Sequence, residues 1–350
     1  MQFGSDNWAG ASDKVMAALV AANGGDVPAY GGDDITKRLE RRMAEAFGRE
    51  VGVLLVATGT AANSLSVTGL IPPYGAVICH RGAHLNTDEC GAPEFFGSNK
   101  LIALGGVGGK ISRGGLAELL DRPLRGVHHV VPSVVSLTQS TELGTVYSVA
   151  EVTELAALAH GKGLIVHMDG ARLANALVHT GASLAAMTWQ AGVDILSFGA
   201  TKGGCLLAEA IVVFDTAHLE RLAYLRKRSG QLVSKHRILS AQFDAWLDGG
   251  HWLELARQAN AMARRLAEGM IASGKARPAF APEANEVFAF IAEPQAERLL
   301  AAGARFYDWD ADLLEPDEQP AAGETLYRFV TSFRTTPEEV DRFLALLAQA

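Results

Sequence analysis

The segment Ile195-Leu-Ser-Phe-Gly-Ala-Thr-Lys-Gly-Gly204 joins a short apolar run to a hydroxyl, a lysine and a pair of glycines. A run of this length, bounded by glycines, predicts a buried strand, so that Lys202 would lie just beyond its end. An amine in that position is partly desolvated, which makes it easier to deprotonate and able to attack an aldehyde. We expect the two glycines to let a bulky molecule approach it.

A second strand end points to the same chemistry. The apolar run Leu164-Ile-Val166 leads through His167 and Met168 to Asp169-Gly-Ala-Arg172. Ligands of open α/β sheets bind at the carboxyl edge of the strands, so Asp169 and Lys202 are expected at one site. Pyridoxal phosphate (PLP) requires this pair: a lysine that holds its aldehyde as a Schiff base, and a buried aspartate that keeps its ring nitrogen protonated. Arg172 could bond the ring hydroxyl or a substrate carboxylate.

A phosphate site is predicted by the stretch Val56-Ala-Thr-Gly-Thr-Ala-Ala-Asn63, which runs from a strand into a helix. The backbone N–H groups and positive dipole end of such a helix bind phosphate. His84, after the strand predicted at 76–79, could stack on the ring. Each signal alone is typical of a turn or a helix cap, but three in this order at strand ends favour a single site.

The rest of the chain predicts an α/β fold in two parts. Short β-branched runs alternate with helical patterns from about Glu50 to Ser240, which is typical of a mainly parallel sheet covered on both faces. The strands are expected at 51–57, 76–79, 127–131, 134–137, 164–168, 195–197 and 210–214, with helices at 61–70 and 149–161. Helices at 252–273 and 337–349 and apolar runs at 287–291 and 327–333 predict a smaller α+β domain. We place the large domain, with the N-terminal segment, at 1–240 and the small domain at 241–350.

Composition and charge limit the kinds of molecule that we expect the chain to bind. The chain has 350 residues, 49% of them hydrophobic, and a net charge of -8, which argues against binding to nucleic acid or an anionic membrane. The N-terminus lacks a signal sequence and no apolar run is long enough to span a bilayer, so we expect neither export nor a membrane anchor. Three cysteines without metal-type spacing suit a reducing compartment, and the cytoplasm fits best.

Three other patterns contain residue types that occur in functional sites. The run at 105–111 resembles a phosphate loop, but Leu104 replaces the first glycine and Ile111 the hydroxyl that would reach magnesium. The group at 79–90, with its histidines, cysteines and Asp88, has ligand-type residues in a segment that reads as a loop, so no metal site is expected. The basic run at 222–237 is either a solvated helix face or a phosphate or subunit contact.

These motifs together resemble the L-threonine aldolases of the fold-type I PLP enzymes, in particular the low-specificity and phenylserine aldolase branch. The resemblance runs nearly end to end. It is carried by Gly4-Ser-Asp6, Ala29-Tyr-Gly-Gly-Asp-Asp34, Thr58-Gly-Thr-Ala-Ala-Asn63, Ala83-His84, Ser136-Leu-Thr-Gln139, His167-Met-Asp-Gly-Ala-Arg172, Ser197-Phe-Gly-Ala-Thr-Lys202 and Tyr327-Arg-Phe-Val330. Many relatives have Glu-Asn at Thr138-Gln139 and a histidine at Ser332, so the preferred substrate side chain can differ.

The resemblance implies roles for individual residues. Lys202 would carry the cofactor, Asp169 would bind its ring nitrogen and His84 would stack on the ring. The remaining implied contacts are Thr58, Gly59, Thr60, Gln139, Thr201 and Arg172 for the cofactor, and Ser5, Tyr30, Arg172 and Arg328 for the substrate. Tyr30 and the basic run at 227–235 could reach the site from a neighbouring subunit, because enzymes of this fold type work as dimers or dimers of dimers.

The implied reaction is retro-aldol cleavage of L-threonine, L-allo-threonine or phenylserine to glycine and an aldehyde. Its base stays open among His84, His128 and an ordered water, and we favour His84. His128 lies in the predicted strand at 127–131 and could equally be a structural histidine. Another fold-type I reaction (aminotransferase, β-eliminating lyase or racemase) and a catalytically silent PLP-fold protein are the alternatives, since fold does not fix reaction.

Overall fold

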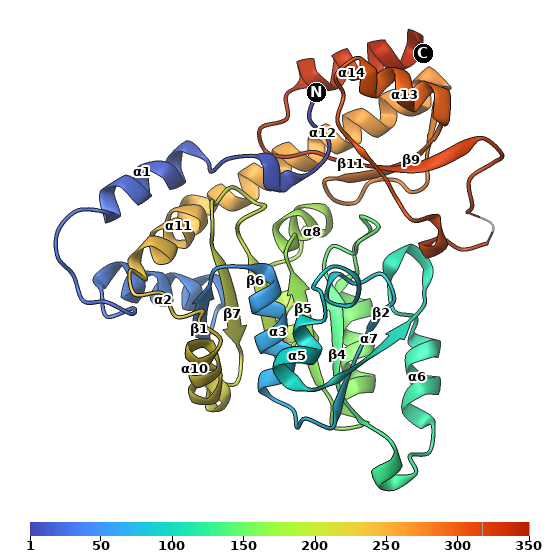
Figure 1. Ribbon diagram of the computed structural model, residues 1–350. Helices are drawn as coiled ribbons and strands as arrows, with labels where there is room; N and C mark the ends of the chain where they lie inside the picture. Colours follow the sequence, from blue (N-terminus) through green and yellow to red (C-terminus); the bar gives the residue numbers. More distant parts are fainter. Residues whose placement is uncertain (317, 350) are drawn as a thin grey trace.

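The computed structural model describes residues 1–316 and 318–349, and its chain forms a large domain around one sheet and a smaller domain around another (Figure 1). The large sheet has seven strands in the order β1-β7-β6-β5-β4-β2-β3. Strand β7 is antiparallel to both neighbours and the others are parallel to one another. The predicted α/β class with a mainly parallel sheet is confirmed.

The strands are β1 (Gly52–Val56), β2 (Gly75–His80), β3 (Lys100–Leu104), β4 (Val131–Thr138), β5 (Ile165–Gly170), β6 (Ile195–Gly199), β7 (Glu209–Val213), β8 (Ala276–Pro278), β9 (Glu286–Ala292), β10 (Tyr307–Asp308) and β11 (Glu324–Val330). The α-helices are α1 (Asp13–Ala22), α2 (Asp34–Phe47), α3 (Gly59–Gly69), α4 (His84–Thr87), α5 (Ala92–Gly97), α6 (Arg113–Asp121), α7 (Val149–His160), α8 (Leu173–Thr180), α9 (Leu184–Met187), α10 (Leu219–Arg228), α11 (Arg237–Leu247), α12 (His251–Ser273), α13 (Glu293–Ala301) and α14 (Pro337–Gln349).

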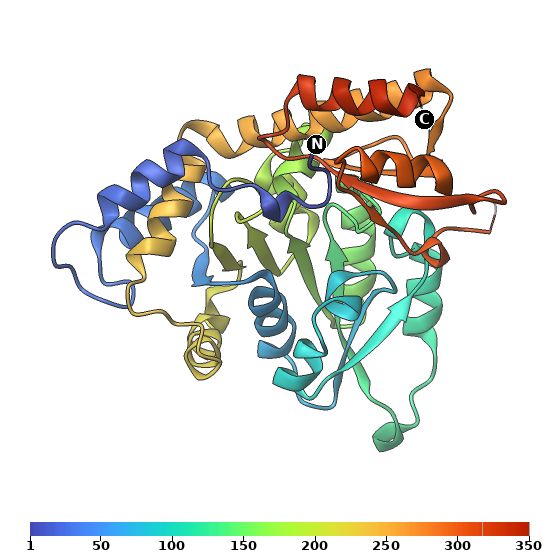
Figure 2. The same ribbon diagram turned by 45° about the horizontal axis from the view of Figure 1, so that its top comes forward.

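Helices cover both faces of the large sheet, which explains why its central strands are apolar along their whole length. One face packs on α3 and α10 through a core that includes Val56, Ile211 and Leu222. The opposite face packs on α2, α7, α8 and α11 in the largest core of the protein. Figures 1 and 2 show α3 in front of the sheet and α7 and α8 behind it.

The strand predicted at 127–131 was wrong, and one strand of the large sheet was missed. The structure has no strand at 127–130: Gly126 has a φ of 58°, residues 126–128 form a 3-10 helix, and Val127 is 99% exposed. Strand β4 begins at Val131 and includes the run predicted at 134–137. The strand that was missed is β3. It lies at the edge of the sheet, pairs only with β2 and has half-exposed side chains, so its sequence lacks the continuous apolar run of a buried strand.

The small domain is a four-stranded antiparallel sheet in the order β10-β11-β9-β8, covered on one face by α12 and α14. Side chains alternate between the two faces of its strands. Val287, Ala289 and Phe329 point into the core shared with the helices, whereas Phe288 packs with Leu143 of the large domain. The second face of this sheet therefore faces the carboxyl edge of the large sheet.

The N-terminal residues lie on the small domain, since Phe3 packs in its core and bonds backbone groups of Arg305 and Val330. The boundary predicted after residue 240 falls within α11, and the division stays a prediction. In the described part of the chain, no helix combines the length and apolarity that crossing a membrane requires.

Candidate active site

The parallel strands place their carboxyl ends at one edge of the large sheet, and β7 begins at that edge. A cavity of about 280 Å³ opens there. Its lining is Asn7, Ala57, Thr58, Gly59, Thr60, Asn63, His84, Glu142, Asp169, Ala171, Ser197, Thr201, Lys202, Leu207 and Glu209. The structure thus brings together seven residues singled out from the sequence: Thr58, Gly59, Thr60, His84, Asp169, Thr201 and Lys202.

Lys202 lies on the segment 200–208 that joins β6 to β7, and α11 holds this segment in place. Trp246 Nε1 donates to the Gly203 carbonyl over 2.9 Å, and Gln242 Oε1 accepts from the N–H groups of Leu206 and Leu207. The glycines serve this packing. A Cβ at Gly203 would lie 3.0 Å from Trp246, and Gly204 has a φ of 121°. Packing and backbone conformation therefore account for both glycines, and the expectation that they make room for a ligand stays a prediction.

Asp169 lies one residue before the end of β5, with its carboxylate fixed on both oxygens. Oδ1 accepts from the N–H of Ala171 at 3.0 Å and Oδ2 accepts from Asn63 Nδ2 at 2.8 Å. Two residues earlier, His167 is fully buried between Ser136 and Ser197, at 2.8 and 2.9 Å. Burial lowers the pKa of His167 to about 4, so it is neutral and acts as a structural link.

The turn from β1 into α3 presents free N–H groups to the cavity. Thr58 is the N-cap, and its hydroxyl accepts from the N–H of Ala61 at 3.1 Å. Within the described chain, the N–H groups of Gly59 and Thr60 have no protein acceptor, and Gly59 has open space on its Cα. Unsatisfied N–H groups at a helix start are an anion site.

His84 begins α4 and is oriented by a buried acid. Its Nδ1 lies 2.9 Å from Glu89 Oε1, and the same oxygen accepts from Asn63 Nδ2 at 2.8 Å. The hydrogen bond with Glu89 raises the pKa of His84. Because a carboxylate only accepts, the proton of neutral His84 lies on Nδ1, and Nε2 is free to take another.

Arg172 is buried and already paired. Its Nε donates to Asp6 Oδ2 at 2.8 Å, and its Nη1 lies 3.2 Å from Glu286 Oε2. Burial alone would raise the pKa of Asp6, but Arg172 and the more distant Lys202 outweigh it and lower it to about 2. Glu286 comes from β9, so Arg172 joins the N-terminal segment, the large domain and the small domain at the rim of the site.

Arg328 stands on β11 with its guanidinium 4.0 Å from the ring of Trp309. Its Nε is buried without a hydrogen-bond partner, and no carboxylate of the described residues lies within 4.0 Å of it. Arg328 and Glu286 occupy the face of the small sheet that looks toward the cavity. Arg328 is therefore a cation whose donors are available to an added carboxylate.

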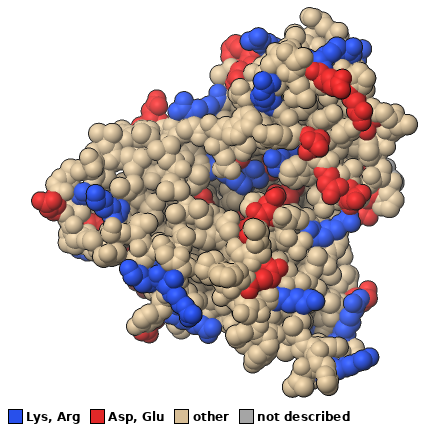
Figure 3. All heavy atoms as spheres, in the orientation of Figure 1, with Lys and Arg blue, Asp and Glu red and all other residues tan. Residues whose placement is uncertain are grey.

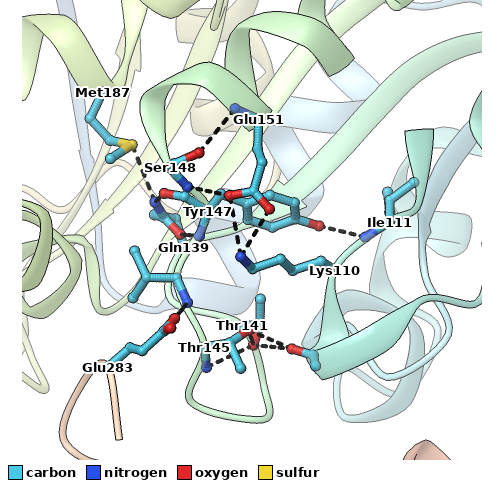
Figure 4. A network of polar contacts seen from close by, with 12 residues as sticks. Lys110, Ile111, Gln139, Thr141, Thr145, Tyr147, Ser148, Glu151, Met187 and Glu283 are labelled. Atoms are coloured by element: carbon cyan, nitrogen blue, oxygen red, sulfur yellow. Dashed lines mark hydrogen bonds and ion pairs between the residues drawn. The ribbon is translucent and has the colours of Figure 1, made fainter. Parts of the chain in front are cut away.

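Besides Arg172 and Arg328, four other residues singled out from the sequence do not line the cavity in this chain. The Gln139 amide is used internally, donating to the Tyr147 carbonyl at 2.8 Å and accepting from its N–H at 2.9 Å, so a side-chain contact with the cofactor is excluded (Figure 4). Ser5 caps a 3-10 helix by accepting from Asn7. Tyr30 is 53% exposed beneath Lys227. His128 is exposed before β4, at the opposite edge of the sheet from Lys202.

The network around Gln139 still matters for the site, because it fixes the segment after β4. Thr141 and Thr145 both donate to the Gly108 carbonyl, at 2.8 and 2.6 Å. Figure 4 shows this cluster beside Tyr147 and the Lys110–Glu151 ion pair. The segment carries Glu142 to the cavity wall.

Five polar residues that line or support the cavity wall were not identified from the sequence: Asn7, Asn63, Glu89, Glu142 and Glu209. Asn63 stands in the quoted turn motif, one helical turn beyond its cap, which was a usable signal. Glu89 follows His84 by five residues, a spacing that does not share a helix face; α4 ends at Thr87, and the turn after it brings Glu89 back. Glu209 looked like an ordinary strand residue.

An amine, a fixed carboxylate and an anion-binding turn around one cavity suit a small aromatic aldehyde that carries a phosphate. The donor set therefore fits PLP on the geometry alone. Among the described residues, no group of three or more histidines, cysteines, aspartates or glutamates is placed to hold a metal ion.

Comparison with known proteins finds a matching family and relatives that agree with this site. The model of the beta-eliminating lyase family matches residues 2–294. A low specificity L-threonine aldolase from Pseudomonas aeruginosa is 40% identical over 341 residues, which is 97% of this chain and 94% of that protein. Another low specificity L-threonine aldolase, from Pseudomonas sp., is 40% identical over 87% of this chain and 88% of its own length. The Leishmania major threonine aldolase structure superposes with a TM-score of 0.91, at 27% identity, over 99% of this chain and 98% of its own.

Proposed function

The chain belongs to the beta-eliminating lyase family, among the low specificity L-threonine aldolases, and on this premise we propose that it cleaves the Cα–Cβ bond of β-hydroxy-α-amino acids. L-Threonine, L-allo-threonine and phenylserine are the proposed substrates, with glycine and an aldehyde as products. The observation that carries the proposal is the cavity in which Lys202, Asp169 and the start of α3 meet.

The cofactor is PLP, as in this family, and the residues of the cavity fit it. Lys202 would present its amine to the aldehyde carbon, Asp169 would hold a proton on the ring nitrogen, and Gly59 and Thr60 would donate N–H groups to the phosphate. When bound, PLP withdraws the electrons of the bond that breaks at Cα.

The substrate carboxylate would bind at Arg328, with Arg172 behind it. Arg328 has free donors, whereas Arg172 is committed to Asp6 and Glu286. A carboxylate fixed at this rim would orient the bonds at Cα and so select the Cα–Cβ bond for cleavage.

His84 Nε2 is the proposed base for the β-hydroxyl proton. Its geometry supports this role, since His84 lines the cavity and Glu89 holds Nδ1 and not Nε2. His128 of the same chain lies at the far edge of the sheet and could contribute only from another copy.

We also propose a cytoplasmic homo-oligomer, a dimer or a dimer of dimers. Large apolar side chains are exposed on α1 (Met16 and Val20), in the connection after it (Val27 and Tyr30), on the segment 200–208 (Leu206 and Leu207) and on α10 (Tyr224). Figure 3 shows few charged side chains over α1 and α11. An apolar surface of this kind suits contact with a second copy, which would bring Tyr30 and Lys227 toward a site. Gel filtration tests the assembly.

The function is tested by supplying L-threonine, L-allo-threonine and phenylserine to the purified protein and following the aldehyde. Aldehyde release from at least one of them is expected, whereas transfer of the amino group to a keto acid without aldehyde would refute the reaction. The cofactor site is tested by the visible absorption band of lysine-bound PLP, which Lys202→Ala should abolish and Lys162→Ala, on the surface, should leave unchanged.

A further inference from the structure

Glu209 is a buried acid of the cavity to which the proposed reaction gives no role. It begins β7, directly opposite Val56 in β1 and Gly199 in β6. Residues opposite one another in a sheet point to the same face, and Val56, with Ile211, lies in the core beneath α3. The Glu209 side chain therefore leaves the sheet toward the first turn of α3, which carries the free N–H groups of Gly59 and Thr60.

The surroundings of Glu209 favour its neutral form. The residue is 7% exposed, and no lysine, arginine or histidine nitrogen lies within 4.0 Å of its carboxylate among residues 1–316 and 318–349. Thr201 hydrogen-bonds it through both the hydroxyl and the backbone. Burial raises the pKa of Glu209 to about 7, against the hydrogen bonds of Thr201 and the charge of Lys202.

Few charges face this carboxyl from the elements packed around it. Strand β1 and helix α3 contain no ionisable side chain. Strand β5 contributes Asp169, whose charge also raises the pKa of Glu209, and the segment after β6 contributes Lys202. Arg226 of α10 points to the Leu55 carbonyl instead, at 3.3 Å.

We propose that Glu209 keeps a proton and donates it in a hydrogen bond to the phosphate of the bound cofactor, so that cofactor affinity depends on the neutral form of this side chain. An ionised carboxylate under the same turn would repel the phosphate, whereas a carboxylic acid adds a donor to those of Gly59 and Thr60. The inference rests on the proposed PLP site, and it adds a residue that binds the phosphate end of the ligand.

The test compares PLP with pyridoxal, which has the same aldehyde and ring but no phosphate. Affinities of the apoprotein for both are measured between pH 6 and pH 9 by the visible band, for the wild type, Glu209→Gln and the exposed control Glu50→Gln. We expect wild-type and control affinity for PLP to fall by about tenfold or more relative to Glu209→Gln as Glu209 ionises. Pyridoxal should show no such difference among the three proteins.

Parallel pH curves for the wild type and Glu209→Gln with PLP would overturn the proposal, as would equal effects on PLP and pyridoxal, which would place Glu209 at the aldehyde end. No visible band in the wild type at any pH would instead refute the PLP site itself. A measurement on the wild type alone avoids dependence on the variant's folding: calorimetry in buffers of different ionisation enthalpy at pH 8. PLP should take up about one proton more than pyridoxal does, and equal uptake would refute the role of Glu209.

Discussion

The side-chain amide of Asn63 donates a hydrogen bond of 2.8 Å to Oδ2 of Asp169. The same nitrogen donates to Glu89 over 2.8 Å, so one amide on α3 joins the acid proposed for the ring nitrogen to the acid that orients His84. Asn63 therefore helps to hold both Asp169 and, through Glu89, the proposed base His84. Their alignment depends on the position of α3 on the sheet.

Replacing Asn63 should loosen both acids. Asn63→Ala removes one hydrogen-bond donor from each of two buried carboxylates, which costs about 1 to 3 kcal/mol of unfolding free energy. Asn63→Asp adds a third negative charge between them and should cost more. Urea unfolding and PLP titration measure both effects, with Asn86→Ala on the surface as the control. Equal behaviour of Asn63→Ala and the control would show that the bridge is not needed.

Replacing Glu89 should move the acid limb of the pH profile. A base must be unprotonated to act, so activity rises with pH through the pKa of His84, and Glu89 raises that pKa. In Glu89→Gln the acid limb of kcat/KM should shift to lower pH. His84→Ala should lower kcat by about 10² to 10⁴-fold. An unshifted limb in Glu89→Gln would assign it to another group.

Arg328→Met tests the substrate carboxylate site. A charged hydrogen bond contributes about 1.5 to 3 kcal/mol, so kcat/KM for L-threonine should fall by about 10 to 100-fold. Affinity for PLP should stay unchanged, because Arg328 does not line the cofactor cavity. Arg342→Met on α14 is the control. Loss of cofactor affinity together with activity would contradict the assignment.

His167 makes stability depend on pH in a defined window. Its pKa is about 4 in the folded protein and 6.5 in its ordinary state, so the unfolded chain takes up the proton first. The stabilisation is complete above pH 6.5 and is lost as pH falls toward 4, by about 3 kcal/mol. Urea unfolding of the wild type and His167→Gln across that range should show this loss only in the wild type. Parallel curves would mean that His167 protonates without penalty.

Gly204→Ala tests how tightly the lysine segment is packed. A Cβ at this position would stand 2.6 Å from Leu255 on a backbone with a φ of 121°. We expect a loss of about 2 to 4 kcal/mol in stability, with a weaker PLP band because Lys202 shifts. The double variant Gly204→Ala/Leu255→Ala should recover part of the band, whereas Gly163→Ala, which has open space, should leave it intact. An unchanged band in Gly204→Ala would show that Lys202 does not depend on this packing.

Local pattern was enough to predict the parts of the site that lie at strand ends. A parallel sheet brings the carboxyl ends of its strands together, so the runs before Thr58, Asp169 and Lys202 located the cavity. The partners of those residues came from other elements at distances in the chain that no local pattern encodes. Arg172 was expected to face a ligand, but its pairing with Asp6 and Glu286 spans 166 residues in one direction and more than 100 in the other.

The three-dimensional surroundings also explain why the predictions for Gln139 and His128 failed. Gln139 follows a strand at the correct edge, but its amide turns inward to bond Tyr147, a choice decided by packing. The β-branched pair around His128 and His129 looks like a strand, yet these residues are exposed at the beginning of β4. The periodicity of apolar residues indicates whether a segment favours a helix or a strand. Which of its side chains reach a site depends on the elements packed around it.

Because β7 runs antiparallel to both neighbours, the connection before it tolerates changes in length less well than the connections between parallel strands. Parallel strands are joined by crossovers that can absorb extra residues at the far edge of the sheet, as the exposed stretch at 122–129 could. Residues 200–208 instead join two antiparallel neighbours whose register is fixed, and α11 pins them at Gly203, Leu206 and Leu207. An insertion there would displace the amine of Lys202 itself. Among proteins built on this plan, gaps should collect before β4 and be absent between β6 and β7.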